Sequence, residues 1–487
     1  MLKKLLKVAW LTVAILLVGG GFLYLAGVRI VLDGGGGIHL GRAKSASQHA
    51  EEIARHRAAQ ESVPAPSTAA SSSAAPSTQV PSTQAPGTQP PGTQPPGTPG
   101  PGTPDWPTFR GPRWDGRYDR RPIRTSWPAA GLKPMWKQPV GEGYASFVIA
   151  GGHAFTIEQR GAEEVVSAYD VDTGRELWTN RWTATFEESM GGNGPRATPT
   201  WNAGKIFALG GTGEMRAIDA ASGRTLWRTN ILADAGAANL QWGMAAAPLV
   251  VGANVIVLPG GTNGQSVVAY DVATGKRAWA SLDDNASYSS PMLVTLAGVQ
   301  QVVLFTATRL VGVAPEDGRL LWEFPWKTQY GVNASQPLVI GGDRLFLSTG
   351  YGTGAGVVEI GSSGGQLSAR EVWRNNFMKN QFTSSVLHEG FIYGLDESIL
   401  ACLDAATGEK KWKNGRYGYG QVMLANGHLI VLTEQGELAL VRATPAKFEE
   451  LARVPALDGK TWNHPAMNDG VLLIRNANEM AAFDLRQ

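Results

Sequence analysis

The sequence predicts an all-β fold: an eight-bladed β-propeller with four-stranded antiparallel blades, behind one N-terminal transmembrane helix and a disordered Pro/Thr/Gln-rich linker. Glycine and tryptophan are abundant, at 61 and 16 of 487 residues, and only 17% of the residues are charged. This composition is typical of turn-rich β structure rather than of coiled coils. One phrase recurs at a period of roughly 40–50 residues, as propeller blades do. An uncharged stretch near the N-terminus is long enough to cross a bilayer.

The repeated phrase is Ala-x-Asp-x-x-Thr/Ser-Gly-x-x-x-Trp. It stands at 168–178, 217–227, 269–279 and 402–412, with a weaker copy at 312–322 and a degenerate one around Trp373. Apolar residues alternate before the Asp, as in a strand with one buried face. The Asp and Thr/Ser side chains can bond turn amides and the Gly tolerates positive φ, so the phrase contains a tight hairpin. The Trp then places a large apolar surface on the following strand.

A matching half-unit precedes each phrase. In the second copy, residues 197–201, 205–209 and 214–219 form three predicted strands before the strand that carries Trp227. Four short strands per unit make a propeller blade, and the Trp spacing predicts eight blades. The last unit, ending at 481–486, lacks its Trp strand, and Met135–Gln138 can supply it. Pairing the two ends in one blade covers two exposed edges and closes the ring.

The N-terminal segments predict attachment to a membrane. Residues 8–28 carry no charge and predict a transmembrane helix, while Lys3, Lys4 and Lys7 place residues 1–7 in the cytoplasm. A cleaved signal peptide is the alternative, but Tyr24 stands where cleavage needs a small residue. Residues 29–63 form a juxtamembrane segment in which Ala50–Arg55 favours a short helix. We therefore expect a single-pass inner-membrane protein with its propeller in the periplasm or outside.

Residues 64–104 are nearly all Pro, Ser, Thr, Ala, Gly and Gln, with a five-residue beat. Such a segment has no apolar face to bury, so it is expected to be a disordered tether ahead of the propeller at 105–487. The formal net charge is +2, and the excess of basic residues lies in the first 60 residues. The propeller therefore lacks the basic surface that nucleic-acid binding needs. The single Cys excludes an intramolecular disulfide and a Cys-based metal cluster.

The phrase resembles the repeat of pyrroloquinoline quinone (PQQ)-type propellers, a family shared by quinoprotein alcohol dehydrogenases and the assembly factor BamB. The resemblance covers about residues 105–487, and the segment Asp105–Pro112 is similar to the leader of many bacterial members. It is specific for the fold and weak for function, because the repeated residues pack blades. The tryptophans expected to pack between blades are Trp136, Trp178, Trp227, Trp279, Trp322 and Trp412.

The resemblance implies a cofactor only in part of the family. Quinoprotein dehydrogenases hold PQQ between a Trp and a disulfide of adjacent cysteines, with Glu, Asn and Asp around a calcium ion. This chain has only Cys402, at the Ala position of a repeat phrase, and no Cys-x-x-Cys-His haem motif. Glu187, Glu188 and Asn193 share one loop but are too few for the six to eight oxygen ligands of calcium. We expect no cofactor and no metal site, with PQQ and calcium left as the alternative; no catalytic residue is identified.

The loops that lead into the innermost strands offer a candidate site, because equivalent loops of a propeller surround one mouth of its channel. Nearly every one carries an aromatic or amide side chain, which suits a polar ligand, a glycan or a peptide. The alternative reading is that loops are polar and Asn forms turns. The candidate residues are Arg196, Gln241, Trp242, Tyr288, Asn333, Lys379, Gln381, Tyr419, Trp462 and His464.

Three functions remain open at this point. The first is a membrane-tethered, monomeric scaffold that binds a protein partner or a small polar or glycan ligand at the mouth, without nucleic acid. The second is a quinoprotein-type dehydrogenase acting on alcohols or sugars. The third is a polysaccharide-binding or other enzymatic activity at the same mouth.

Overall fold

The computed structural model describes residues 28–32, 38–42, 46–61, 106–128 and 130–487. The predicted residues 1–7, the predicted tether 64–104 and all but the last residue of the predicted span 8–28 lie outside these ranges. Ahead of the propeller, β1 (Val28–Leu32) pairs with β2 (Ile38–Arg42), and α2 (Ala46–Glu61) contains the predicted helical stretch. None of the helices in the described ranges is long and apolar enough to span a bilayer.

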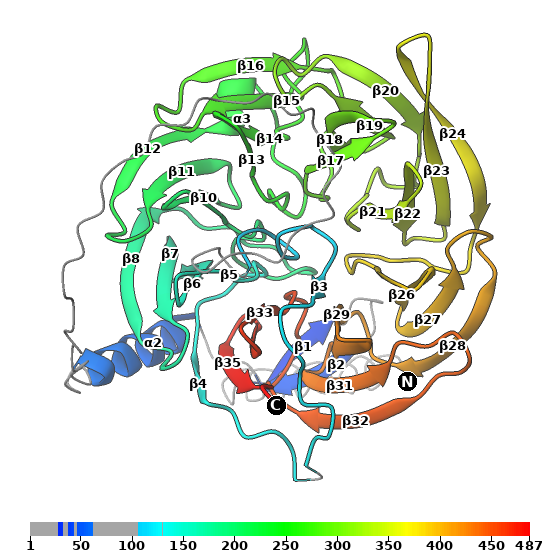
Figure 1. Ribbon diagram of the computed structural model, residues 1–487. Helices are drawn as coiled ribbons and strands as arrows, with labels where there is room; N and C mark the ends of the chain where they lie inside the picture. The colour runs from blue at the N-terminus through cyan, green and yellow to red at the C-terminus, as the bar shows by residue number, and fades with distance from the viewer. Residues whose placement is uncertain (1–27, 33–37, 43–45, 62–105, 129) are drawn as a thin grey trace, which may run out of the picture.

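Eight sheets surround a central axis, so the predicted eight-bladed propeller is confirmed (Figure 1). Each blade has four antiparallel strands, and the innermost strand comes first in the chain in the seven blades that begin at β5, β9, β13, β17, β21, β25 and β29. The first four blades are β5 (Val148–Ala150), β6 (His153–Arg160), β7 (Glu163–Asp170), β8 (Glu176–Thr183); β9 (Thr200–Asn202), β10 (Lys205–Leu209), β11 (Glu214–Asp219), β12 (Thr225–Asn230); β13 (Leu249–Val251), β14 (Asn254–Val257), β15 (Val267–Asp271), β16 (Arg277–Ser281); and β17 (Met292–Leu296), β18 (Val299–Phe305), β19 (Arg309–Val313), β20 (Leu320–Pro325). A short helix, α3 (Ile231–Ala235), follows β12.

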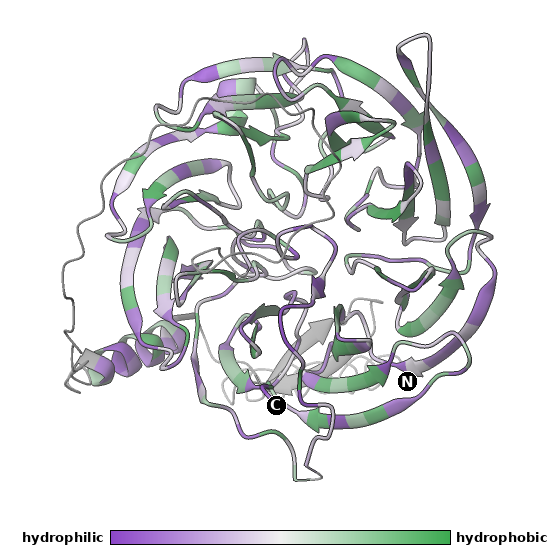
Figure 2. Cartoon of the chain, in the orientation of Figure 1, coloured by the Kyte–Doolittle hydropathy of each residue, from purple (hydrophilic) through white to green (hydrophobic). Residues whose placement is uncertain are grey.

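The remaining blades complete the circle. They are β21 (Leu338–Gly341), β22 (Arg344–Thr349), β23 (Gly354–Ser363), β24 (Gln366–Asn375); β25 (Val386–His388), β26 (Phe391–Asp396), β27 (Ile399–Asp404), β28 (Lys410–Arg416); β29 (Gln421–Ala425), β30 (His428–Leu432), β31 (Glu437–Arg442), β32 (Glu450–Pro455); and β33 (Ala466–Asn468), β34 (Val471–Arg475), β35 (Glu479–Asp484) with β4 (Trp136–Pro139). A fifth strand, β3 (Arg117–Tyr118), lies parallel to β29. Hydrophobic residues concentrate on the strands of the blades, whereas α2 is mostly hydrophilic (Figure 2).

The ring closes through the strand that the sequence predicted. β4 pairs antiparallel with β35, from Trp136 opposite Ala482 to Pro139 opposite Glu479. The amide of Met135 also donates to the carbonyl of Ala482 at 2.8 Å. The eighth blade is therefore made from both ends of the propeller sequence, and neither β4 nor β35 is left as a free edge.

All the repeat tryptophans but Trp322 dock on the hairpin of the next blade. Trp178 Nε1 donates to the carbonyl of Ala220 at 3.1 Å, and the ring lies against Gly223 so closely that a Cβ there would be 2.7 Å from Cδ2. The same bond to the following blade is made by Trp136 to Val171, Trp227 to Val272, Trp279 to Pro315, Trp373 to Ala405 and Trp412 to Thr444. The Gly of the phrase is thus the seat of the preceding blade's Trp.

Trp322 differs from the other tryptophans. Its Nε1 donates to Gln301 Oε1 within its own blade. The next blade cannot receive it, because β23 and β24 run for ten residues each and meet in a Gly364-Gly365 turn in place of the Asp-x-x-Thr-Gly hairpin. Trp322 is still buried, at 4% exposure. It packs within the core near Trp326 rather than locking two hairpins together.

Residues 106–118, called the leader from here on, cross the middle of the ring (Figure 1). Trp106 exchanges two backbone hydrogen bonds with Ile149 of β5 and is completely buried. Arg110 Nη2 donates to the carbonyl of Ser385 at 2.6 Å, and the amide of Leu424 donates to Gly116. The leader therefore joins the innermost strands of the first and seventh blades and the residue before the innermost strand of the sixth.

Candidate functional site

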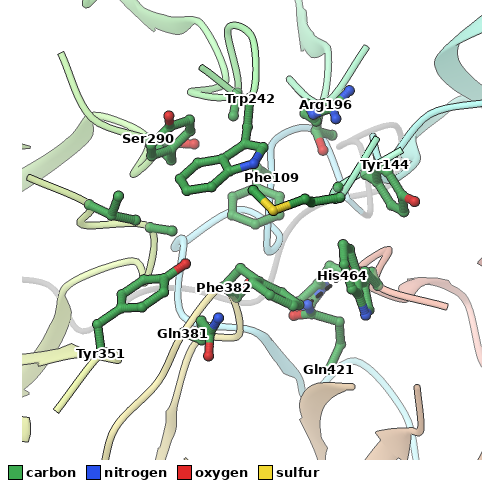
Figure 3. Close-up of a pocket in the computed structure, with 18 residues that line it drawn as sticks. Phe109, Tyr144, Arg196, Trp242, Ser290, Tyr351, Gln381, Phe382, Gln421 and His464 are labelled. Carbon is green, nitrogen blue, oxygen red and sulfur yellow. Dashed lines mark hydrogen bonds between the residues drawn. The ribbon is translucent and has the colours of Figure 1, made fainter. Parts of the chain in front are cut away.

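A cavity of about 360 Å³ lies where the loops into the innermost strands meet (Figure 3). Every blade contributes at least one side chain, and the leader contributes Phe109. The lining residues are Phe109, Tyr144, Met190, Gly191, Arg196, Thr198, Trp242, Ala245, Tyr288, Ser290, Val332, Ala334, Tyr351, Gln381, Phe382, Gln421, Trp462 and His464. Because the leader crosses the channel and Phe109 forms part of the wall, the cavity is a pocket at one mouth of the ring.

Seven Phe, Tyr and Trp side chains dominate the wall, and several touch one another. Trp462 lies 4.5 Å from Phe382 and 5.3 Å from Tyr144 between ring centroids. On the other side, Trp242 lies 5.6 Å from Tyr288. These separations are within the range of favourable aromatic pairs, so the rings hold one another in place without a ligand.

Polar contacts fix the aromatic wall. Trp462 Nε1 donates to Glu434 Oε1 at 2.9 Å, and Gln421 Nε2 donates to the carbonyl of Trp462 at 2.9 Å. His464 Nδ1 donates to the carbonyl of Pro465 at 2.7 Å, and its ring meets Phe109 edge to face at 5.7 Å. Burial lowers the pKa of His464 to about 3, so this imidazole is neutral at physiological pH.

Two cations flank Tyr144 at one side of the cavity. Arg196 Cζ is 5.5 Å and Lys460 Nζ is 5.7 Å from the centroid of the Tyr144 ring. Lys460 Nζ is also 4.1 Å from the Trp462 ring and donates to the carbonyl of Gly191 at 3.3 Å. Burial lowers the pKa of Lys460 to about 8 and also lowers the pKa of Arg196. Within the described ranges, neither cation has a carboxylate at salt-bridge distance.

The structure brings six of the ten candidate residues into the cavity wall: Arg196, Trp242, Tyr288, Gln381, Trp462 and His464. The other four lie elsewhere. Gln241 is exposed beside Trp242. Asn333 is fully buried, where it donates to the carbonyl of Thr306 and accepts from Thr349.

Lys379 and Tyr419 complete the four. Lys379 Nζ pairs with Asp396 at 3.0 Å, so Lys460 takes its place as the second cation of the mouth. Tyr419 packs behind the wall, 5.6 Å from Phe382. The predicted residues missed Phe382, which directly follows Gln381 and was signalled by its aromatic side chain in the same loop. They also missed Phe109, for which the sequence carries no signal.

The side chains considered for a metal or a quinone do not assemble into such a site. Glu188 accepts hydrogen bonds from Met190 and Gly191 of its own loop, and Asn193 Nδ2 donates to Glu142 at 3.2 Å. The described part of the chain contains no group of three or more His, Cys, Asp or Glu placed to hold a metal ion. Cys402 is buried in β27 among the core residues of its blade, and burial raises the pKa of its thiol to about 12.

Known proteins share this architecture. The chain is 25% identical over 318 residues to outer membrane protein assembly factor BamB of Burkholderia pseudomallei, across 62% of this chain and 74% of that protein. Among solved structures, BamB from Moraxella catarrhalis matches with a TM-score of 0.52 and 15% identity, over 72% of this chain and 99% of that one. Quinohemoprotein alcohol dehydrogenase from Comamonas testosteroni matches with a TM-score of 0.56 and 15% identity, over 79% and 81%. At these identities the two structural matches show the fold alone.

The family model described as outer membrane protein assembly factor BamB matches residues 162–414, from the hairpin of the first blade to the outer strand of the sixth. This range contains Trp322, five of the six tryptophans that dock on a neighbouring hairpin, and the glycines that seat four of those five. Because the match extends over more than half of the sequence, the chain belongs to the PQQ-like propeller family of outer membrane protein assembly factor BamB.

Proposed function

We propose that this protein is a membrane-attached, extracytoplasmic scaffold that binds a partner polypeptide in the mouth cavity. The observation that carries the proposal is the aromatic pocket itself, which is closed from behind by the leader and open at one mouth. A chain cannot thread through such a pocket, so the occupant is a side chain or turn presented by the partner. The naming of the relatives as outer membrane assembly factors supports a role beside other proteins in the cell envelope.

The character of the wall favours a polypeptide over a glycan. None of the described residues that line the cavity is a carboxylate, and the polar groups are few compared with the aromatic and aliphatic ones. Apolar side chains continue onto the rim, where Met190 is 46% and Tyr330 is 61% exposed. Aromatic side chains and Met are enriched at the centres of protein interfaces.

The side chains that line the cavity do not fit the PQQ and calcium that part of the fold family carries. Calcium needs six to eight oxygen ligands, and the cavity wall offers amide and hydroxyl oxygens only. The sole thiol is Cys402, within the sheet of its blade. We therefore assign no quinone chemistry to the cavity.

Attachment through residues 8–28 is part of the proposal, with the propeller on the extracytoplasmic side. The charge distribution supports it, because three lysines precede the uncharged stretch. Protease added to intact spheroplasts should degrade the propeller, and protection of the propeller would place it in the cytoplasm instead.

Trp242→Ala and Trp462→Ala test the mouth. Full-length protein is purified from native membranes after crosslinking, and the captured partner is then titrated against each variant. Each substitution is expected to weaken binding by about 1–3 kcal/mol, as removal of an interface aromatic does. Phe377→Ala, at an exposed aromatic outside the cavity, is the control and should bind as the parent does. If both tryptophan variants folded and bound with unchanged affinity, the mouth would not be the binding site. Capture of a saccharide by the same residues would show that the ligand is a glycan and not a polypeptide.

A further inference from the structure

Helix α2 lies on the seam where the ring closes. It contacts β4, the strand that completes the last blade, and the β7–β8 hairpin of the first blade (Figure 1). His49 Nε2 donates to the carbonyl of Val140 at 2.7 Å, and Ile53 is 2% exposed. One face of the helix is thus covered by the propeller, while Ala54, Arg55 and Ala58 face solvent.

Arg57 makes the most extensive contact between α2 and the propeller. Its guanidinium donates to Glu176 at 3.2 Å, to Gln138 Oε1 at 3.0 Å and to the carbonyl of Pro139 at 2.9 Å. Gln60 Nε2 donates to the same Gln138 oxygen at 2.7 Å. The helix therefore binds the closing strand and the neighbouring blade together.

Arg57 reaches a charge network that is buried beneath the seam. Glu176 also accepts from Arg160, which in turn donates to the fully buried Glu158 at 2.7 Å. Burial by itself raises the pKa of Glu158, but Arg160 and Arg475 outweigh it and hold that pKa below its ordinary value. Arg475 comes from β34 of the last blade and donates to Thr156 of the first blade at 2.7 Å. The seam thus presents a preformed acidic position, Glu176, to Arg57 of the helix.

The contact is polar and small. Ile53 is the only large aliphatic side chain in α2, and the helix is drawn as largely hydrophilic (Figure 2). An isolated helix of 16 residues is marginal in water, so α2 depends on docking for its structure. Elements that bury little apolar surface open at lower free energy than the core of the same protein. Docking of α2 is therefore separable from folding of the propeller.

The order of segments along the chain gives this separation a consequence. Residues 62–105 join the end of α2 to the start of the leader, and both of these ends rest on the propeller. We propose that the seam formed by β4 and the β7–β8 hairpin is a reversible docking surface whose ligand is α2 of the same chain. When α2 is docked, the helix itself connects residue 45 to the propeller, so the length of residues 62–105 does not contribute to the distance between them. When α2 is released, these 44 residues can add up to about 136 Å at ~3.1 Å per residue.

Hydrogen exchange of the full-length protein tests the docking. In the parent, amides of α2 should exchange more slowly than a free helix and faster than those of β26 and β27. Arg57→Glu places a like charge against Glu176 and should accelerate exchange in α2 by at least about tenfold without changing β26 or β27. Arg55→Glu makes the same charge change on the exposed side of the helix and should leave exchange at the parent rate.

Spin labels at Ala58 and Asp172, both exposed, supply a second measurement. The parent should give a short, narrow distance together with a broad, longer component, and Arg57→Glu should move the population into the broad component. Exchange in parent α2 as fast as in Arg57→Glu would mean that the helix does not dock. Exchange as slow as in β26, with only the short distance, would mean that α2 is a permanent part of the fold. Either result overturns the proposal.

Discussion

The docking of Trp178 on the hairpin glycine of the next blade makes a quantitative prediction for Gly223. This residue has φ +73° in the β11–β12 hairpin, and an added Cβ would lie 2.7 Å from two atoms of the Trp178 ring. Gly204, in the β9–β10 hairpin of the same blade, has φ +77° with nothing within 4 Å of an added Cβ. Substitution by Ala at the two positions therefore costs the same backbone strain but only one of them displaces a tryptophan.

The expected losses follow from these two environments. A left-handed backbone costs a residue with a Cβ about 1–2 kcal/mol, and this applies to both variants. Overpacking against the Trp178 ring adds about 1–3 kcal/mol in Gly223→Ala. Displacing the ring also weakens its hydrogen bond to Ala220, which contributes about 1 kcal/mol. Gly223→Ala should thus lose about 1–4 kcal/mol more stability than Gly204→Ala.

Urea unfolding of the full-length variants, followed by tryptophan fluorescence, measures the difference. The denaturant midpoint should fall further in Gly223→Ala, with the dependence on urea unchanged. Equal losses in the two variants would refute the view that the phrase glycine is conserved within this chain's repeats to seat a tryptophan, and would leave backbone geometry as the only reason for glycine there.

Three other predictions concern the closure of the ring, the leader and His464 in the cavity wall. Deleting residues 135–140 removes β4, so the last blade should lose its outer strand and the protein should aggregate or unfold at lower temperature; an unchanged melting temperature and monomeric state would contradict closure by β4. Arg110→Ala removes the bond from the leader to Ser385 and should cost about 2–3 kcal/mol, whereas the exposed Arg113→Ala should cost little, as measured by urea unfolding. His464 has its pKa lowered to about 3 by burial, against about 6.5 when unfolded, so the unfolded chain binds the proton first and stability falls as pH drops from 6.5 towards 3. At pH 5 this loss is about 2 kcal/mol, and His464→Gln should remove it; the same acid dependence in both proteins would show that His464 is not the group responsible.

The repeat was readable from the sequence because its chemistry is local. The Asp, Ser and Gly of residues 219–223 and the Trp at 227 lie within one hairpin, and short-range turn and strand preferences fix them. Even the closure was predictable, since a unit without its Trp strand and a spare strand at 135–138 require each other. The mouth loops followed from the same repeat, because equivalent positions of each blade must meet around one axis.

Only the tertiary structure decided which side chains from those loops face the cavity. Asn333 turns into the core and Lys379 pairs with Asp396, while Lys460 enters the mouth from the loop of Trp462. Phe109 reaches the mouth from the leader, which the repeat does not include. The same holds for the seam, where Arg57 meets Glu176 across 119 positions of sequence. Periodicity specifies the backbone of a blade, but a side chain's partners depend on packing between segments distant in sequence. Such contacts leave no pattern along the chain, and so the fold was determined by the sequence alone and the composition of the site by how the segments pack.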